Sequence, residues 1–178
     1  MKSRIKNVSA LLATGGLAVC LSGCTIGAIA LVGYHVMNKE KTFTKEGMSI
    51  TLTAQFEEEE LATQTCYYKS PQVSVVGLKE EFEDNAGLCD CTLEVYTEET
   101  IEERALETEY ETSKDGYTYF TYEKELGGDD YVYLATCHKT GDAFWLIQFW
   151  CESDDYDRME DKIFKYADSI TFEVEKAV

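Results

Sequence analysis

Basic residues are scarce in this sequence: 16 Lys and Arg stand against 34 Asp and Glu, and the net charge is −18 over 178 residues. Residues 1–40 carry +3, so residues 41–178 carry −21. A field of that sign repels nucleic acid phosphates and anionic membrane surfaces, which argues against nucleic acid as a partner. It leaves basic proteins, cationic surfaces and metal cations open, and it also favours solubility outside the cell.

The short motifs of common hydrolases and redox enzymes are also missing. The sequence has two histidines, and neither belongs to a G-x-S-x-G or H-E-x-x-H motif. A histidine base needs a nucleophile and an orienting acid within hydrogen-bond reach, and no such signature surrounds His138. We therefore predict that His138 is an exposed strand residue, that the protein is not an enzyme and that it uses no cofactor. A hydrolase or redox enzyme with an unrecognised site is the alternative.

Paired cysteine motifs are absent from the body of the chain. Its five cysteines are an odd number, which excludes a complete disulfide framework, and no C-x-x-C pair indicates zinc. We interpret most of them as small buried apolar residues, and Cys89-Asp-Cys91 as a buried or bridged pair. A bridge from Cys66 to another cysteine stays open. Cys137 and Cys151 lie at opposite ends of one predicted hairpin and should not face each other.

The N-terminal segment lacks charge altogether. Basic residues at positions 2, 4 and 6 precede it, and residues 8–37 contain no Asp, Glu, Lys or Arg. This is the build of an export signal. Because about twenty apolar residues already span a bilayer, the segment is also long enough for an uncleaved transmembrane anchor. Positive residues before it and an acidic body after it predict that the body is exported.

Cys24 distinguishes these two forms of attachment. Leu21-Ser-Gly-Cys24 resembles the bacterial lipobox, and the resemblance implies that Cys24 is diacylated and begins the mature lipoprotein. The apolar run from Thr25 to Met37 fits the transmembrane anchor instead. In both cases residues 1–40 form the signal or anchor. Residues 41–178 then form an extracytoplasmic domain held at the cell membrane.

The body of the chain predicts one domain with strands and two helices. Alternating apolar residues and apolar runs bounded by turn residues indicate strands, and apolar residues at helical spacing indicate surface helices. The predicted strands are 48–53, 73–78, 108–113, 117–126, 131–139, 143–151 and 169–174. The predicted helices are 92–107, capped by Thr92 or Asp90, and 155–167, capped by Ser153.

The strand at 143–151 decides the predicted architecture, because its apolar side chains point to both faces. One face receives Trp145, Ile147 and Phe149, and the other receives Phe144, Leu146 and Trp150. A strand that is apolar on both sides belongs in the middle of a sheet covered on both faces. We therefore predict an α+β fold: an antiparallel sheet of six or seven strands with helices on both faces.

The order of these elements, opened by "FTKEGMSITLT" and closed by "YADSITF", resembles the PsbP-like fold of photosystem extrinsic subunits and Ran-binding Mog proteins. The segment Asp142–Phe149 resembles a strand of uncharacterised membrane-anchored, lipoprotein-like bacterial proteins. The resemblance covers residues 42–174 and implies an α/β/α sandwich that binds or assembles without catalysis. It transfers no site. Many exported members place Pro and Trp behind the first strand, and Leu52–Phe56 has neither.

Two groups of residues are candidates for ligand contact. Asp154, Asp155 and Asp157 form a carboxylate cluster that calcium could use, although the D-x-[DN]-x-[DN]-G loop is missing. The second group comprises Tyr117, Tyr119, Tyr131 and Tyr133, which either pack under a helix or contact a protein or glycan partner. We expect a membrane-tethered, non-catalytic binding or assembly module. A calcium-dependent surface protein is a further alternative.

Overall fold

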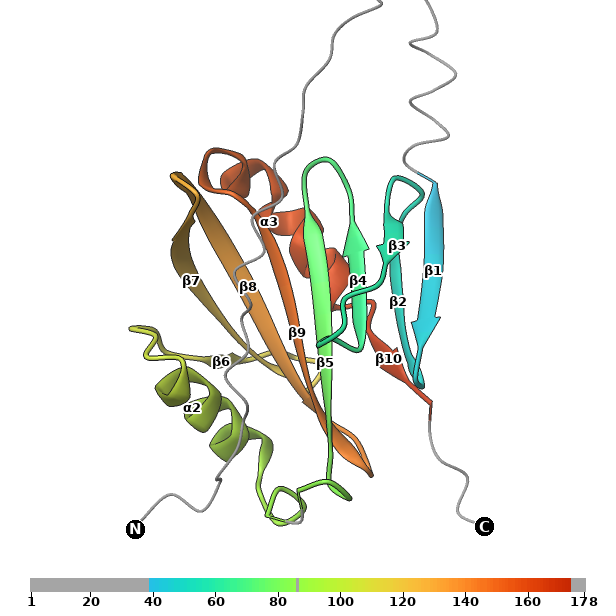
Figure 1. The fold of residues 1–178 in the computed structure, drawn as a ribbon, viewed down its shortest axis with the longest axis vertical. Coiled ribbons are helices and arrows are strands. Elements are labelled where there is room, and N and C mark those ends of the chain that lie inside the picture. The colour runs from blue at the N-terminus through green and yellow to red at the C-terminus, as the bar shows by residue number, and fades with distance from the viewer. Residues whose placement is uncertain (1–38, 86, 174–178) are drawn as a thin grey trace, which may run out of the picture.

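A computed structural model describes residues 39–85 and 87–173 of the chain. These residues form two antiparallel sheets and two helices (Figure 1). The larger sheet has seven strands in the order β3-β4-β5-β9-β8-β7-β6, and the smaller sheet has three in the order β1-β2-β10. The strands of the larger sheet are β3 (Glu57–Glu59), β4 (Cys66–Lys69), β5 (Ser74–Glu81), β6 (Glu111–Thr112), β7 (Thr118–Leu126), β8 (Asp129–Lys139) and β9 (Ala143–Glu152). The strands of the smaller sheet are β1 (Glu40–Lys45), β2 (Met48–Thr53) and β10 (Thr171–Phe172).

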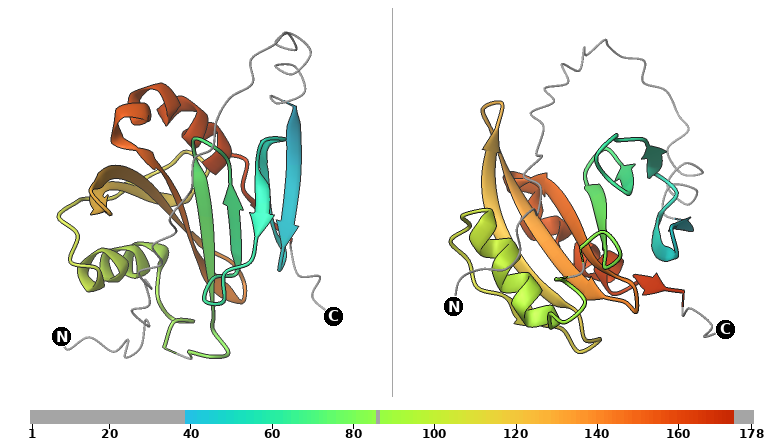
Figure 2. Two further views of the ribbon diagram at one scale, coloured as in Figure 1. Left: turned by 45° about the horizontal axis from the view of Figure 1, so that its top comes forward. Right: turned by 60° about the horizontal axis from the view of Figure 1, so that its bottom comes forward.

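Helices cover both faces of the larger sheet, which confirms the predicted antiparallel sheet between helices. The first, α2 (Leu93–Glu103), lies over β7 and β8 on one face. The second, α3 (Ser153–Ala167), lies on the other face together with the smaller sheet (Figure 2). We call these the α2 face and the α3 face. Each face has its own apolar core.

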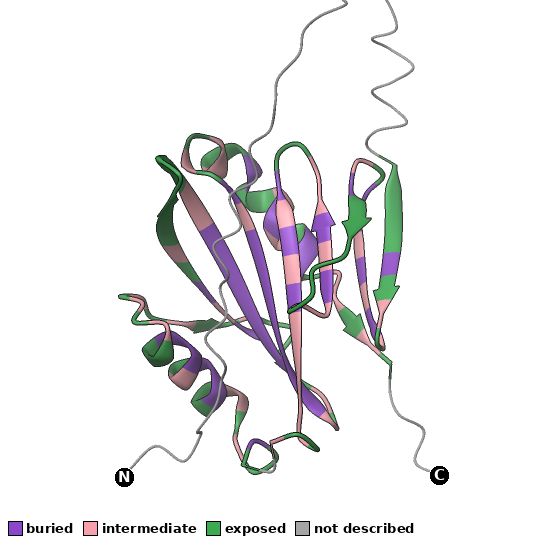
Figure 3. Cartoon of the chain, viewed as in Figure 1, coloured by how far each residue is buried: buried purple, intermediate pink, exposed green. Residues whose placement is uncertain are grey.

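Strand β9 contributes to both cores, as its sequence predicts. Trp145, Ile147 and Phe149 pack into the α3-face core, where Ile163 of α3 also lies. Phe144 and Leu146 pack into the α2-face core. There the ring of Tyr96 from α2 stacks on Phe144, with centroids 4.2 Å apart. Figure 3 shows the resulting band of buried residues along β8 and β9. Burial of side chains of this size is worth about 1.5–3 kcal/mol each.

The prediction that one sheet contains every strand is wrong. The strand at 48–53 forms β2 with the predicted bounds, but β2 pairs with β1 and β10. The strand predicted at 169–174 is only β10, two residues at the edge of the smaller sheet. The chain reaches β10 directly from α3, which lies one layer away from the larger sheet. There it pairs with β2.

Three strands could not be predicted from alternating apolar residues, because they lack such a pattern or are too short to show it. β3 is Glu57–Glu59 and fully exposed, and β1 buries only Phe43. Backbone pairing with β4 and β2 holds these strands, and pairing carries no side-chain signal. The third is β4, of four residues. The strand predicted at 108–113 is reduced to the two residues of β6.

The helix ends follow local backbone chemistry. Thr92 is the N-cap of α2, as predicted, and its Oγ1 accepts a hydrogen bond from the Val95 N–H at 3.3 Å. The helix ends four residues before the predicted position, and Ala105 beyond it has φ +52°, a left-handed conformation that cannot continue a helix. The predicted cap Ser153 is wrong. α3 begins at Ser153 itself, and the N-cap is Glu152, whose side chain makes no cap hydrogen bond.

Candidate functional site

A row of aromatic rings crosses the part of the α2 face that lies beyond α2. Tyr122 on β7 and Tyr133 on β8 are direct cross-strand partners, and Tyr133 is in turn the partner of Trp150 on β9. Tyr67 on β4 reaches Trp150 across β5, where the short side chain of Ser74 is paired with Trp150. We call Tyr67, Trp150, Tyr133 and Tyr122 the aromatic row. It draws on strands far apart in the sequence.

The rings of the aromatic row stand face to face. The ring centroids of Tyr122 and Tyr133 are 4.8 Å apart, which is the separation of neighbouring strands, and the ring planes differ by 8°. The ring of Trp150 lies 5.7 Å from Tyr133 at 22° and 6.0 Å from Tyr67 at 7°. Each inner ring therefore has its faces against other rings, and the row turns ring edges outward. Tyr133 is buried, and the other three are half-buried.

Gln148 joins the aromatic row to the end of α2. This β9 side chain is 7% exposed, and its Nε2 donates a hydrogen bond to the Tyr122 hydroxyl at 2.5 Å. Its Oε1 accepts from Nη1 of Arg104, the C-cap residue of α2, at 3.5 Å. Burial raises the pKa of the Tyr122 hydroxyl, so that group stays protonated. The row is thus held at one end by a buried polar network, which fixes the ring positions.

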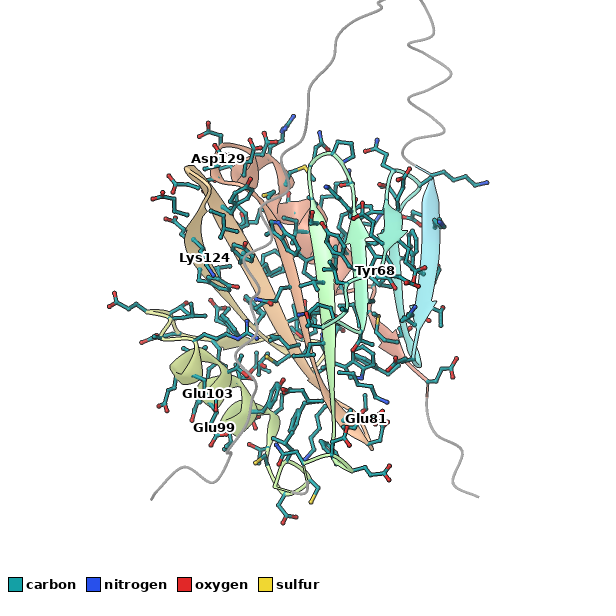
Figure 4. All side chains as sticks on the ribbon, in the orientation of Figure 1. Tyr68, Glu81, Glu99, Glu103, Lys124 and Asp129 are labelled. Atoms are coloured by element: carbon teal, nitrogen blue, oxygen red, sulfur yellow. The ribbon has the colours of Figure 1, made fainter. Side chains whose placement is uncertain are left out.

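Charged side chains of both signs lie beside one end of the row. Lys124 of β7 is paired with Tyr131 of β8, beside the exposed hairpin turn that Asp129 follows. Figure 4 shows Lys124 and Asp129 near the outer end of this hairpin. Burial, Asp129 and Glu152 raise the pKa of Tyr131. An apolar centre with a charged rim is the usual composition of a protein contact surface.

The structure divides the four predicted tyrosines between the two faces. Tyr133 belongs to the aromatic row, and Tyr131 lies next to it on β8. Tyr119 packs edge-on against Phe164 of α3 at 5.3 Å, and Tyr117 is 5% exposed. Tyr119 thus packs under a helix, and Tyr117 packs against the ring of His138. Sequence reasoning missed Tyr67 as a partner of Trp150, because only the strand order β4-β5-β9 brings the two rings together.

The cysteines do not assemble a reactive site. Cys66, Cys137 and Cys151 are buried, as predicted, and burial raises the pKa of their thiols to about 11, 12 and 11. Such thiols stay protonated and are poor nucleophiles. Cys137 and Cys151 lie in the cores of opposite faces, as expected. The interpretation of Cys89 and Cys91 as a buried or bridged pair is wrong, because Cys89 is exposed and Cys91 is a partly exposed free thiol.

The prediction that His138 is exposed is also wrong. Its side chain is 8% exposed, because Tyr117 and Phe172 pack against the ring with centroids 5.1 and 5.3 Å away. Its Nε2 lies 3.0 Å from the Thr136 hydroxyl. Burial lowers the pKa of His138 to about 3, so the ring is neutral at physiological pH. The covering Phe172 comes from β10, which sequence neighbours of His138 cannot reveal.

The other predicted site residues are not gathered into one site. Cys24 lies outside the described residues. Asp154, Asp155 and Asp157 lie in the first turns of α3, and Asp155 Oδ1 accepts from Arg158 at 2.6 Å. Within residues 39–85 and 87–173, no three His, Cys, Asp or Glu side chains are placed to hold a metal ion. No helix in that same part of the chain has the length and apolar character to span a bilayer.

The fold has counterparts among solved structures. The Ran-binding protein Mog1p of Saccharomyces cerevisiae matches with a TM-score of 0.50 and 10% identity, over 75% of this chain and 95% of Mog1p. A protein of Bacteroides thetaiotaomicron VPI-5482 matches with a TM-score of 0.50 and 11% identity, over 78% of this chain and 50% of that one. The cyanobacterial PsbP of Synechocystis sp. PCC 6803 gives 0.49 and 11%, over 84% and 98%.

The two likenesses with a TM-score of 0.50 show a Mog-like α/β fold, in agreement with the resemblance drawn from the sequence. At 10 and 11% identity they show the fold alone. No protein-family model matches the chain. No curated protein matches it in sequence either.

Proposed function

We propose that this protein is a membrane-tethered, extracytoplasmic binding module without catalysis, and that it contacts a protein partner through the aromatic row. The observation that carries the proposal is the half-buried series of Tyr67, Trp150 and Tyr122 around the buried Tyr133, on a sheet face that α2 covers only in part. Tyrosine and tryptophan are enriched in the centres of protein interfaces, where their large side chains contribute much of the binding energy.

The ring geometry favours a protein over a glycan. A sugar ring stacks on an open aromatic face, whereas the faces of Trp150 and Tyr133 are occupied by neighbouring rings. What remains outward is a series of ring edges and hydroxyl groups, which suits edge-to-face contacts and hydrogen bonds with side chains. Mog1p, which has the same fold, is a Ran-binding protein. The fold is therefore compatible with protein binding in that case.

Charge supports a basic partner. Residues 41–178 carry −21, and a field of that sign accelerates association with a positively charged surface. The attraction is screened by salt, because the Debye length falls from about 10 Å at 0.1 M to about 3 Å at 1 M. The proposed partner is thus a protein with net positive charge and an apolar contact.

The tether belongs to the same proposal. Residues 8–37 are free of charge and follow three basic residues, and Cys24 ends a lipobox-like tetrapeptide. Either a diacylated Cys24 or a transmembrane helix would hold the domain on the outer side of the cell membrane. The intact mass of the protein purified from its own membrane decides between them. Loss of residues 1–23 with a gain of acyl mass supports Cys24, and full length supports the helix.

The binding proposal is tested with full-length protein in non-ionic detergent, incubated with envelope extract and cross-linked from a photoreactive residue at position 67. The same photoreactive residue placed at position 110 is the matched control, since Tyr110 is half-buried but lies outside the row. We expect one cross-linked protein from position 67, none of it from position 110, and loss of the product in Trp150→Ala and in 1 M salt. Equal cross-linking at both positions, or retention of glycan alone, would contradict the proposal.

A further inference from the structure

A concave surface lies on the α3 face of the larger sheet, opposite the aromatic row. A cleft of about 380 Å³ opens between the turn before β7, the end of β8, the end of α3 and β10. Its aromatic lining consists of Tyr117, His138 and Phe172, in which the His138 ring lies between the other two. Tyr117 and His138 are 5% and 8% exposed, and Phe172 is half-buried. Tyr117 and His138 thus show only a small part of their surface to the cleft, and the size of the cleft suits a small ligand.

Negative charge gathers at the rim of this cleft. Asp168 is exposed, and its Oδ1 accepts a hydrogen bond from the Tyr117 hydroxyl at 2.7 Å, which orients the carboxylate. The same residue is the C-cap of α3, so the negative end of the helix dipole points to the cleft. Asp115 is a second exposed carboxylate in the lining. A carboxylate at a helix C-terminus is electrostatically unfavourable, and a bound cation would offset this repulsion.

The cations near the cleft do not offset this charge. Lys139 lines the cleft, but its Nζ donates to the carbonyl oxygens of Cys89 and Cys91 at 3.3 and 2.5 Å. The ammonium group also lies 5.3 Å above the ring of Phe144, in the core of the α2 face. It is thus engaged on the other side of the sheet. Lys114 lies in the turn beside Asp115 but is exposed and outside the lining.

His138 adds no positive charge either. Burial lowers its pKa to about 3, so its ring is uncharged at neutral pH and acts as an aromatic and hydrogen-bonding wall. Nε2 is placed against the Thr136 hydroxyl, and among the described residues Nδ1 has no hydrogen-bond partner. A nine-tenths buried polar side chain with a spare nitrogen in a cleft is an observation that favours a bound ligand independently of the carboxylates.

We propose that this cleft binds an organic cation that has N–H donors and an apolar stem, such as an alkylammonium or alkylguanidinium group. The cation would lie between the Asp168 and Asp115 carboxylates, where charge-assisted hydrogen bonds form. The apolar stem would contact Phe172 and Ala167. The ring of Phe172 would also attract the cationic group, because aromatic rings attract cations over their faces. A quaternary ammonium ion lacks donors for the carboxylates and binds more weakly. This site is separate from the aromatic row and does not depend on the function proposed for the row.

Four of the five probes have a four-carbon chain, and the fifth is a quaternary ammonium ion. We would titrate full-length protein in non-ionic detergent with n-butylammonium, n-butylguanidinium, n-butanol, butyrate and tetramethylammonium, using calorimetry and the NMR ring signals of Tyr117, His138 and Phe172. The fluorescence of Trp145 gives a third signal, since its ring lies 5.6 Å from Phe172. We expect millimolar or tighter binding of the two primary cations. We expect at least about tenfold weaker binding of the other three compounds.

The decisive variant is Asp168→Asn. Its amide oxygen still accepts the Tyr117 hydrogen bond, and only the charge is lost. We expect about tenfold lower affinity for n-butylammonium, together with an unchanged or higher melting temperature, because the helix C-terminus no longer carries a carboxylate. Asp157→Asn, at an exposed position near the start of α3, is the matched control and should bind as the wild type does.

A peptide with one arginine identifies the source of the cation. Tighter binding of the peptide than of n-butylguanidinium assigns the cleft to an arginine side chain of a protein, and equal or weaker binding assigns it to a free small molecule. The proposal is overturned if n-butanol binds as well as n-butylammonium, or if Asp168→Asn leaves the affinity unchanged. It is equally overturned if neither primary cation binds at about 10 mM, which corresponds to less than about 3 kcal/mol.

Discussion

The Sγ atom of Cys66 lies in the space that a side chain on Gly77 would need. A β-carbon built at position 77 would be 2.6 Å from Sγ, closer than such atoms approach in real structures. The two residues are direct partners across β4 and β5. Cys66 is buried in the α3-face core, so its thiol has little room to move. Glycine at position 77 is therefore a packing requirement, with no positive φ involved.

Gly77→Ala should lower the free energy of unfolding by about 1–3 kcal/mol, the usual cost of overpacking a buried site. Chemical unfolding of the full-length protein in detergent measures the change. Gly141→Ala is the matched control, because a β-carbon there meets no atom within 4 Å. The double variant Cys66→Ala/Gly77→Ala should be more stable than the sum of the two single changes predicts, since it removes the clash. Additive losses would show that the contact with Sγ is not the cause.

The sequence allowed the larger sheet to be predicted where side chains alternate between two buried faces. Residues 143–151 carry that pattern, and β9 has both faces buried. The signal fails for β3, because its three glutamates are exposed and are held by backbone pairing with β4. The neighbouring β4 has no clear sequence pattern of its own. The signal also fails for the strand at 169–174, since the layer that α3 occupies decides where the chain continues.

The candidate sites could not be predicted from the sequence without the pairing register of the sheet. Tyr133 was named from the sequence, but its ring partners Tyr122 and Trp150 follow from pairings that composition does not specify. The sequence predicts an exposed His138, because no catalytic signature surrounds it. Its ring is instead covered by Phe172, 34 positions further along the chain, which packs there only after α3 has formed. Contacts between distant segments are thus the part that local patterns left out.

The buried His138 predicts a pH-dependent stability. Its pKa is lowered from about 6.5 to about 3, so the unfolded chain binds a proton that the folded chain does not between these values. Above pH 6.5 the titration of His138 therefore costs the folded protein no stability. As the pH falls from 6.5 toward 3, the free energy of unfolding falls by at most about 1.4 kcal/mol per pH unit. The carboxylates of Asp115 and Asp168 line the same cleft, and the cause of the lowered His138 pKa is burial.

His138→Phe removes the titrating group while keeping an aromatic side chain between Tyr117 and Phe172. Between pH 6.5 and 4.5 we expect the free energy of unfolding to fall less steeply in this variant than in the wild type. Chemical unfolding at half-unit pH intervals measures both slopes. Asp155→Asn, whose carboxylate lies on the outside of α3 beside Arg158, is the control for general acid effects. Parallel slopes for His138→Phe and wild type would show that His138 does not titrate as a buried residue.

Asp142, an acid rather than a base, predicts a smaller loss of stability as the pH falls. A hydrogen bond from Thr140 at 2.7 Å and contact with Lys79 at 2.9 Å lower the pKa of this carboxyl. Its stabilising effect is present above the usual aspartate pKa and is lost as the pH falls through the lowered value. Since the side chain is 42% exposed, Asp142→Asn should cost only about 0.5–1 kcal/mol at pH 7 and less at pH 3. A cost that is equal at both pH values would contradict the electrostatic origin.

The two tryptophans of the chain report on opposite faces of the larger sheet. Trp145 is 1% exposed in the α3-face core, and Trp150 is half-buried in the aromatic row. In Trp145→Phe, which keeps only Trp150, acrylamide should quench the fluorescence strongly. In Trp150→Phe, which keeps only Trp145, quenching should be weak, because folded packing excludes the quencher. Stern–Volmer constants measure the difference.

Partner binding then gives these variants a second use. If the aromatic row contacts a protein, adding that protein should reduce the quenching of Trp150 and leave the quenching of Trp145 unchanged. The cation cleft predicts the converse: n-butylammonium should alter the emission of Trp145, which neighbours Phe172, without changing access to Trp150. A partner that protects Trp145 but not Trp150 would place the protein contact on the α3 face and refute the assignment of the row as the binding surface.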